Sequence, residues 1–404
     1  MRLLWVHLSG AHTAGRRNQE RQERRENGKG TLVSDLHSAP GSARVTLTQT
    51  AAPQFHERIS TQSIMWTVCA ALLPAAMWGC YVYGFAALLV LATALFASVA
   101  TEVLITRSHK TLCDGSAVLT GLLLGMMMPP TAPWYVVVTA AVFAIGVVKW
   151  SFGGLGSNWM NPALAGRVFV QFSWSGPMTR WVMPRTLDVD SVAAATPLSL
   201  VQNAVNAGDL LLTGASDYLS GIGFPRSALD SGVTEWLNHN LLARVSVHLP
   251  PGYVDPFVGN VPGSLGEGSA LLLLLGTVVL FGKRIITWEI PTAFFCGFAG
   301  LTWLLGGVPY GSGLFSGDVL FHLVSGSAIL VMFYVATDPV TSPMTTAGML
   351  VFGAGAGIIA FLIRAFGGAP EGAALALLFM NACTPIINRV VRPRRFGYRM
   401  GSSR

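Results

Sequence analysis

The stretch Gly115-Ser-Ala-Val-Leu-Thr-Gly-Leu-Leu-Leu-Gly-Met-Met-Met-Pro-Pro130 decides the class of fold. It is almost wholly apolar, yet it is shorter than the roughly 20 residues that a helix needs to cross the hydrocarbon core of a membrane, and two prolines end it. Broken segments of this kind occur at membrane depth only where they line a site enclosed by protein. A similar piece runs from Gly326-Ser-Ala-Ile-Leu330 to Asp338-Pro-Val-Thr-Ser-Pro343. Unless the likeness is chance, the chain has two related halves.

Other apolar stretches surround these two pieces, and several are long enough to span a bilayer. Five spans in each half would place the halves in opposite orientations, so the repeat would be inverted. We therefore expect an all-α polytopic membrane protein with about ten transmembrane helices in two inverted five-helix halves, some of them broken. The stretches are 62–82, 85–106, 115–130, 134–150, 160–174, 268–282, 286–306, 319–337, 346–364 and 372–390.

Composition supports this class and excludes others. Only 11% of the 404 residues are charged, whereas a soluble domain is usually about one quarter charged, which excludes a soluble globular enzyme, a coiled coil and a disordered scaffold. The net charge of +7 is not gathered on one face, so we expect no nucleic-acid partner. The five cysteines show no paired spacing, so neither a disulfide framework nor a metal site is indicated.

The positions of the charges predict the domain organisation and the orientation. Residues 1–58 are polar and form a disordered cytoplasmic tail, without the apolar core of a cleavable signal peptide, and translation starting downstream of Met1 stays open. The first membrane half is 59–174, the second is 267–390, and 391–404 is a basic cytoplasmic C-terminus. The segment 175–266 is the one long hydrophilic connection, and we expect it outside, because the short basic connections belong to the cytoplasmic side.

The outer segment contains Asp190-Ser-Val-Ala-Ala-Ala-Thr196-Pro-Leu-Ser-Leu200, which has two interpretations. Thr196 followed by Pro197 is a good helix start, with threonine as the N-cap and proline at the first helical position. Alternatively, a hydroxyl flanked by three alanines is sterically open, and a modifying enzyme can esterify it to a phosphate.

A glycine-rich bend precedes two amides in the stretch Phe152–Arg167. Such a bend lets the backbone approach a flat ligand, and Asn158 and Asn161 can bond its polar edge. A close helix crossing that needs glycine is the alternative. Neither this stretch nor Gly259–Glu267 has the Gly-Lys-Ser/Thr of a phosphate-binding loop.

Ionisable residues at membrane depth are candidates for function. Asp338, Glu267 and Glu371 lie where the Gly/Pro-rich segments break or begin, so they are the first candidates for ion coupling. Capping and mutual pairing are the structural alternatives for the whole set, which is Glu102, Asp114, Lys149, Glu267, Glu289, Asp338 and Glu371.

Together these motifs resemble the D subunit of the Rnf electron-transport complex and, slightly less, the B subunit of the sodium-translocating NADH:quinone reductase. The resemblance covers about His56 to Arg399, and Arg392–Arg399 with Pro129–Trp134 favour the Rnf protein. It rests on His56–Met65, Phe152–Arg167, Asp190–Leu198, Gly259–Glu267, Ala336–Val340 and Phe366–Gly372.

The resemblance implies a urea-channel-like fold and covalent FMN. The family joins FMN by a phosphoester to the threonine of a Ser-Gly-Ala-Thr motif preceded by an aspartate, which correspond here to Thr196 and Asp190. This chain has Ala193 and Ala194 where the family has serine and glycine, which leaves flavinylation open. A second, non-covalent riboflavin beside the Asn-x-x-Asn-Pro motif of the quinone reductase would correspond to Asn158 and Asn161.

The implied function is that of a membrane flavoprotein, one component of a redox-driven Na⁺ or H⁺ pump of the Rnf type, located in the cell inner membrane. It carries electrons between ferredoxin and NAD. The implied partners are the FMN-bearing G subunit, the membrane-embedded A and E subunits, the iron–sulfur B and C subunits, a flavin transferase and membrane lipid. The alternatives are the B subunit of the quinone reductase and a passive channel or transporter for a small solute.

Overall fold

The computed structural model describes residues 60–107, 113–187, 194–207, 215–245, 248–309, 312–367 and 372–392. All of them belong to one compact unit. The predicted N-terminal tail and nearly all of the predicted basic C-terminus lie outside the described residues, as do Asp190 and Glu371.

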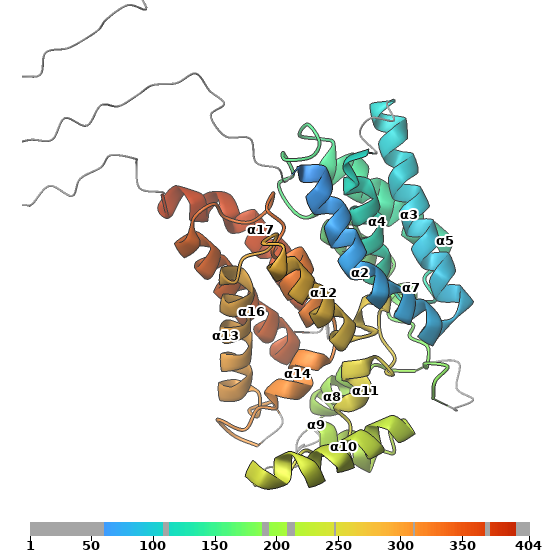
Figure 1. Cartoon of the computed structure of the whole chain (residues 1–404), viewed down its shortest axis with the longest axis vertical. Helices are drawn as coiled ribbons and strands as arrows, with labels where there is room; N and C mark the ends of the chain where they lie inside the picture. Colours follow the sequence, from blue (N-terminus) through green and yellow to red (C-terminus); the bar gives the residue numbers. More distant parts are fainter. Residues whose placement is uncertain are drawn as a thin grey trace, which may run out of the picture. The chain divides into compact units, whose positions relative to one another are not determined.

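The described chain is an α-helical membrane protein, as expected. Four helices are long and apolar enough, by length and composition, to cross a membrane: α2 (Thr61–Tyr83), α3 (Phe85–Thr106), α16 (Thr346–Phe366) and α17 (Gly372–Val390). Shorter apolar helices accompany them in the bundle of Figure 1. They are α4 (Ser116–Met126), α5 (Trp134–Val142) with its π-helical continuation η2 (Phe143–Lys149), α12 (Ala270–Gly282) and α13 (Glu289–Leu305). The less apolar helix α6 (Pro162–Ser173) packs with them.

The apolar stretch 319–337 is not one continuous helix. It divides into α14 (Val319–Val324), α15 (Ala328–Leu330) and the π-helical η5 (Val331–Val335). The division falls at Ser325-Gly326-Ser327, where Gly326 has a φ of 82°, in the left-handed region that ends a helix. Gly115, which precedes α4, has a φ of 76°. The two pieces that resemble each other in sequence therefore share a left-handed glycine followed by a buried serine.

Close helix contacts hold the bundle together. α13 lies beside α16, and Gly353 of α16 faces the carbonyl oxygen of Ile290 so closely that a methyl group there would lie 2.6 Å from it. Gly357, one turn further, faces the carbonyl oxygen of Phe294. In a membrane the hydrophobic effect does not drive helices together, because the lipid is itself apolar. Close packing of the two backbones is therefore a main source of helix association.

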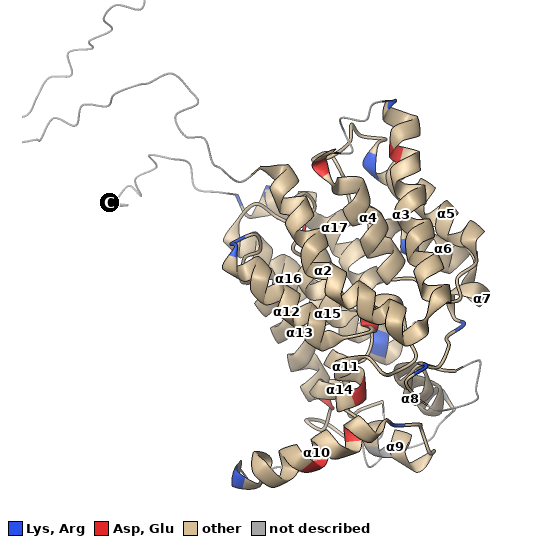
Figure 2. Ribbon diagram, turned by 45° about the vertical axis from the view of Figure 1, so that its right-hand side comes forward, with Lys and Arg blue, Asp and Glu red and all other residues tan. Residues whose placement is uncertain are grey.

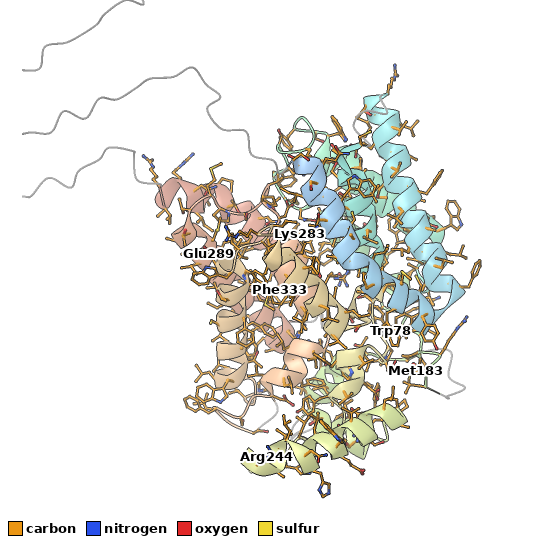
Figure 3. The ribbon with its side chains drawn as sticks, viewed as in Figure 1. Trp78, Met183, Arg244, Lys283, Glu289 and Phe333 are labelled. Atoms are coloured by element: carbon orange, nitrogen blue, oxygen red, sulfur yellow. The ribbon has the colours of Figure 1, made fainter. Side chains whose placement is uncertain are left out.

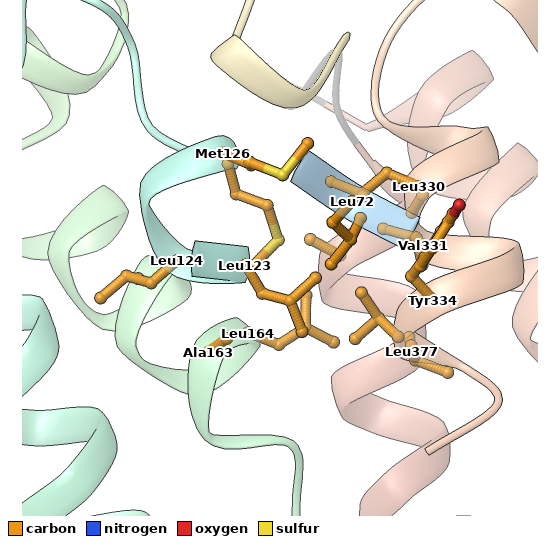
Figure 4. Close-up of a cluster of buried hydrophobic side chains, with 14 of the residues drawn as sticks. Leu72, Leu123, Leu124, Met126, Ala163, Leu164, Leu330, Val331, Tyr334 and Leu377 are labelled. Atoms are coloured by element: carbon orange, nitrogen blue, oxygen red, sulfur yellow. The ribbon is translucent and has the colours of Figure 1, made fainter. Parts of the chain in front are cut away.

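Helices from the first and from the last part of the described chain pack into one hydrophobic core. Leu72, Leu123 and Leu164 of α2, α4 and α6 meet Leu330 and Leu377 of α15 and α17, and all five are buried (Figure 4). The charged residues gather mostly near the ends of the bundle (Figure 2). Lys283 and Glu289 lie at the end opposite Arg244 (Figure 3).

The segment 175–266, in which the sequence indicated only a helix start at Thr196-Pro197, folds mainly into short helices. They are α7 (Ser175–Met178), α8 (Pro197–Asn206), α9 (Ala215–Gly221), α10 (Ala228–Asn240), η3 (Leu242–Val245), α11 (Val254–Val258) and η4 (Leu265–Glu267). α8 to α11 lie together at one end of the bundle in Figures 1 and 2. A small core joins them to the membrane helices, because Leu198 and Val201 of α8 pack with Phe321 of α14.

A buried carboxylate organises the outer helices. Asp230 of α10 accepts hydrogen bonds from the backbone N–H groups of Gly252 at 2.7 Å and Val254 at 2.9 Å. Asp255 accepts one from the backbone N–H of Ser227 at 2.8 Å. Burial raises the pKa of Asp255, and the hydrogen bonds from Ser227 oppose this shift only in part.

Candidate functional site

Thr196 is the N-cap of α8, and Pro197 occupies the first helical position. Its Oγ1 accepts a hydrogen bond from the backbone N–H of Ser199 at 3.1 Å and donates one to Ser199 Oγ at 2.9 Å. The capping interpretation of the sequence is therefore confirmed. The residue is only 7% exposed, so the hydroxyl is less open in the folded chain than the flanking alanines suggested.

A small cavity lies beside Thr196. Thr196 lines it together with Glu267, Ser325 and Gly326, which come from η4 and from the break between α14 and α15. The structure thus brings two predicted site residues, Thr196 and Glu267, to one place. Asp190, the other predicted residue of this motif, falls outside the described chain.

Glu267 is held by a capping box and faces buried arginines. Its Oε2 accepts a hydrogen bond from the backbone N–H of Ser264 at 3.3 Å, while Oε1 has no hydrogen-bond partner among the described residues. Arg167 and Arg364 both interact electrostatically with the carboxylate. Arg167 Nε donates to the carbonyl oxygen of Met127 at 2.9 Å, which fixes its side chain at the end of α4.

A larger cavity, called the deep cavity below, lies among α2, α4 and η5, with about 730 Å³ of space not filled by atoms, part of it open to solvent. Asn158, Asn161 and Asp338 all line it. Asn161 caps α6 through its Oδ1, which accepts from the backbone N–H groups of Ala163 and Leu164 at 3.1 and 3.3 Å. Asn158 Oδ1 is buried and has no partner among the described residues. The two amides and one of the predicted ion-coupling carboxylates therefore share one cavity.

An ion pair borders the same cavity. Lys149 Nζ lies 2.6 Å from Glu102 Oε2 and 2.6 Å from Ser116 Oγ. Both charged side chains are only 1% exposed. The pair joins α3 to η2 and gives two of the membrane-depth charges a structural role, as the alternative interpretation of these residues expects.

Sequence reasoning did not single out Arg364, Ser325 or Ser327. Arg364 is a lone cation within the 21-residue apolar helix α16, which was the available signal, because a charge inside a membrane helix is rarely without function. The two serines gave no such signal, since serine is common in the close contacts of membrane helices. Their positions depend on the break in the chain at Gly326.

The bundle and its cavities define an integral membrane protein of many helices with several ionisable groups buried among them, including Glu102, Lys149 and Arg167. The family model described as the NQR2, RnfD, RnfE family matches residues 48–397, and the chain belongs to this family.

Three relatives illustrate the similarity, which extends over most of each chain. The chain is 40% identical to the D subunit of the proton-translocating ferredoxin:NAD(+) oxidoreductase complex of Clostridium ljungdahlii, over 84% of this chain and 93% of the relative. It is 39% identical to the D subunit of the ion-translocating oxidoreductase complex of Stutzerimonas stutzeri, over 84% and 93%. It is 38% identical to the D subunit of the Na(+)-translocating ferredoxin:NAD(+) oxidoreductase complex of Acetobacterium woodii, over 87% and 96%.

Proposed function

We propose that this chain is the D subunit of an ion-translocating ferredoxin:NAD⁺ oxidoreductase complex of the Rnf type and carries electrons through FMN esterified to Thr196. The observation that carries the proposal is the similarity along residues 48–397 to a family whose members include D subunits of such complexes. The flavin supplies the electron chemistry, and the protein supplies its placement and electrostatic surroundings.

The acceptor role of Thr196 is supported by its place in the fold. Its Oγ1 lies at the start of α8, where the backbone N–H groups and the helix dipole favour a bound phosphate. In the modification, the O–P bond forms at Oγ1, the bond from phosphorus to the leaving group of the activated flavin donor breaks, and the hydroxyl proton departs. Because Thr196 is nearly buried, we expect the transferase to act before α8 packs against the bundle. Asp190 would belong to the recognition motif.

The deep cavity is our candidate for a second, non-covalent flavin of the riboflavin type. Asn158 presents a buried oxygen without a partner among the described residues, and the lining combines apolar side chains with a few polar groups, as is typical of small-molecule sites. An isoalloxazine ring has polar atoms along one edge, which an amide oxygen and an amide N–H can bond.

We infer that Asp338 and Glu267 couple electron transfer to ion movement. Glu371, which lies outside the described residues, is a third candidate. Asp338 lines the deep cavity, and Glu267 lines the cavity beside Thr196. The names of the relatives leave the ion open, because one is called proton-translocating at 40% identity and another Na(+)-translocating at 38%.

The layout that we propose has two inverted five-helix halves, 59–174 and 267–390, in the cell inner membrane. The left-handed glycines before α4 and α15, each followed by a buried serine, support the repeat. The segment 175–266 would face outward, where the G subunit could approach Thr196. The membrane-embedded A and E subunits and the iron–sulfur B and C subunits would complete the assembly.

The test is in-gel flavin fluorescence of the chain co-expressed with a flavin transferase. Denaturation strips non-covalent flavin, so a fluorescent band in the native sequence that disappears in Thr196→Ala identifies the ester. Thr196→Ser is the matched control, because it keeps both the hydroxyl and the helix cap and should remain fluorescent. A dark native band, with the transferase active on another acceptor, would contradict the proposal and favour a passive channel.

A further inference from the structure

We propose that Ser325, Ser327 and Arg364 form the seat that holds the phosphodiester of the flavin at Thr196. This inference rests on the proposed function, because it concerns the same covalent FMN. It assigns a positioning role to three residues that come from the break between α14 and α15 and from α16. None of them belongs to the sequence motif around Thr196.

The first observation is a pair of buried hydroxyls without partners. Ser325 is 3% exposed and Ser327 1% exposed, and neither Oγ has a hydrogen-bond partner among the described residues. A buried polar group left unpaired destabilises a fold, so two of them on either side of one glycine require an explanation. Ser325 lines the same cavity as Thr196, which places one of these donors beside the acceptor hydroxyl.

The second observation is the contact between α8 and Arg364. A methyl group at Gly326 would lie 3.0 Å from Arg364 Nη2 and 3.7 Å from Leu198 Cδ2, so the guanidinium and the first turn of α8 approach the same glycine. Gln202 Nε2 of α8 also donates hydrogen bonds to the carbonyl oxygens of Arg364 and Gly367, at 3.4 and 2.5 Å. The helix that Thr196 begins therefore rests on the end of α16 that carries the arginine.

The third observation is the charge of the cluster. Arg167 and Arg364 both interact with the carboxylate of Glu267, so these three buried groups carry a net positive charge when all of them are ionised. A net charge in a buried cluster is unfavourable. A phosphodiester carries one negative charge, and the N-terminus of α8 would favour it as well. The flavin phosphate would thus neutralise the cluster and give both serine hydroxyls an acceptor.

The size of the cavity beside Thr196 limits which part of the flavin can lie in it. The cavity has about 280 Å³ of space not filled by atoms, part of it open to solvent. The phosphate would be the part of the flavin that lies beside Thr196, and the isoalloxazine ring would lie outside, accessible to a redox partner. Restraint of the phosphate would limit the range of positions of the ring, and electron transfer depends on such placement.

The test compares unfolding temperatures of the full chain with and without attached flavin. In the unmodified chain, Ser325→Ala/Ser327→Ala removes two unpaired hydroxyls and should leave the Tm unchanged or raise it. In the flavinylated chain, the same change should lower the Tm, because the phosphate loses two donors. Ser98→Ala is the matched control, since Ser98 Oγ on α3 is also buried without a partner among the described residues, and it should behave alike in both forms.

A second measurement follows the rate at which a phosphodiesterase releases flavin from the folded chain. We expect a several-fold faster release from the double variant and from Arg364→Lys, with no change in Ser98→Ala. An equal gain in Tm on flavinylation in the native chain and the double variant, together with equal release rates, would overturn the seat. Absence of covalent flavin from the native chain in the denaturing gel would instead contradict the proposed function, so the two failures are distinguishable.

Discussion

Asn161 donates a hydrogen bond through Nδ2 to Asp338 Oδ2 at 3.3 Å, across 177 positions of the chain. The same amide caps α6 through Oδ1, so both of its polar atoms are engaged. Asn158, three residues earlier, lines the same cavity and keeps a buried oxygen without a partner among the described residues. The two asparagines are therefore not equivalent: Asn161 joins two parts of the bundle, and Asn158 is available to a ligand.

Asn158→Ala is expected to lower the amount of flavin released by acid precipitation and to leave the covalent flavin band unchanged. The physical reason is the loss of one ligand bond in the deep cavity, with no contact to Thr196. Released flavin per chain is measured by fluorescence. Ser157→Ala is the control, because Ser157 is exposed and should retain all of the released flavin. Equal release from the native chain and Asn158→Ala would remove Asn158 from the second site.

Lys149→Met is expected to destabilise the bundle by about 3–5 kcal/mol, because it leaves Glu102 buried without its partner. Combining it with Glu102→Gln should recover much of this loss, since no buried charge then remains. Thermal unfolding in detergent provides the measurement. Lys283→Met changes an exposed lysine and should have almost no effect. A mild effect of Lys149→Met alone would mean that water or lipid headgroups reach Glu102.

Two glycine substitutions should change the stability of the bundle in opposite directions. Gly357→Ala forces a methyl group against the carbonyl oxygen of Phe294, and we expect a loss of about 1–3 kcal/mol through separation of α13 and α16. Gly300→Ala on α13 meets no atom within 4 Å, so its better helix propensity should stabilise by about 0.5–1 kcal/mol. Thermal unfolding of the two variants beside the native chain measures both changes in stability. A stable Gly357→Ala variant would show that the two helices are free to separate.

The outer helices should lose stability as the pH rises. The folded-state pKa of Asp255 is raised by burial, so the protonated form is favoured in the fold. The resulting stabilisation is complete below the unfolded pKa of about 3.9 and is lost as the pH rises through the higher folded value. Hydrogen exchange of α10 and α11 between about pH 4 and 7 measures this slope. Asp255→Asn should flatten it, and an unchanged slope would assign the pH dependence to another group.

Apolar length and composition were enough to predict most of the apolar helices of the bundle, but not the short helices of segment 175–266. The expected stretch 85–106 coincides with α3, and 372–390 coincides with α17. Helix breaks were predicted less completely, because a left-handed residue such as Gly326 interrupts a segment whose apolar pattern continues through it. The π-helical turn that ends at Lys149 has no signature in composition at all.

The candidate site was predictable only in its local parts. The cap at Thr196 and the cap at Asn161 follow from a residue and the proline after it. The neighbours of Thr196 come from η4 and the α14–α15 break, and Arg364 from α16. No spacing rule joins segments so far apart, because their meeting depends on how the helices pack. A lone arginine within an apolar helix was the one signal that sequence offered.

The Lys149–Glu102 pair has a consequence for how the chain enters the membrane. Glu102 lies near the C-terminal end of α3, and Lys149 is the last residue of η2, so either charge alone would be buried there without compensation. Together they form a neutral pair, but only when α3 and η2 are already neighbours. We therefore expect Glu102 to become fully enclosed only after residues 143–149 have packed against α3, which makes this pair a late contact in the assembly of the bundle.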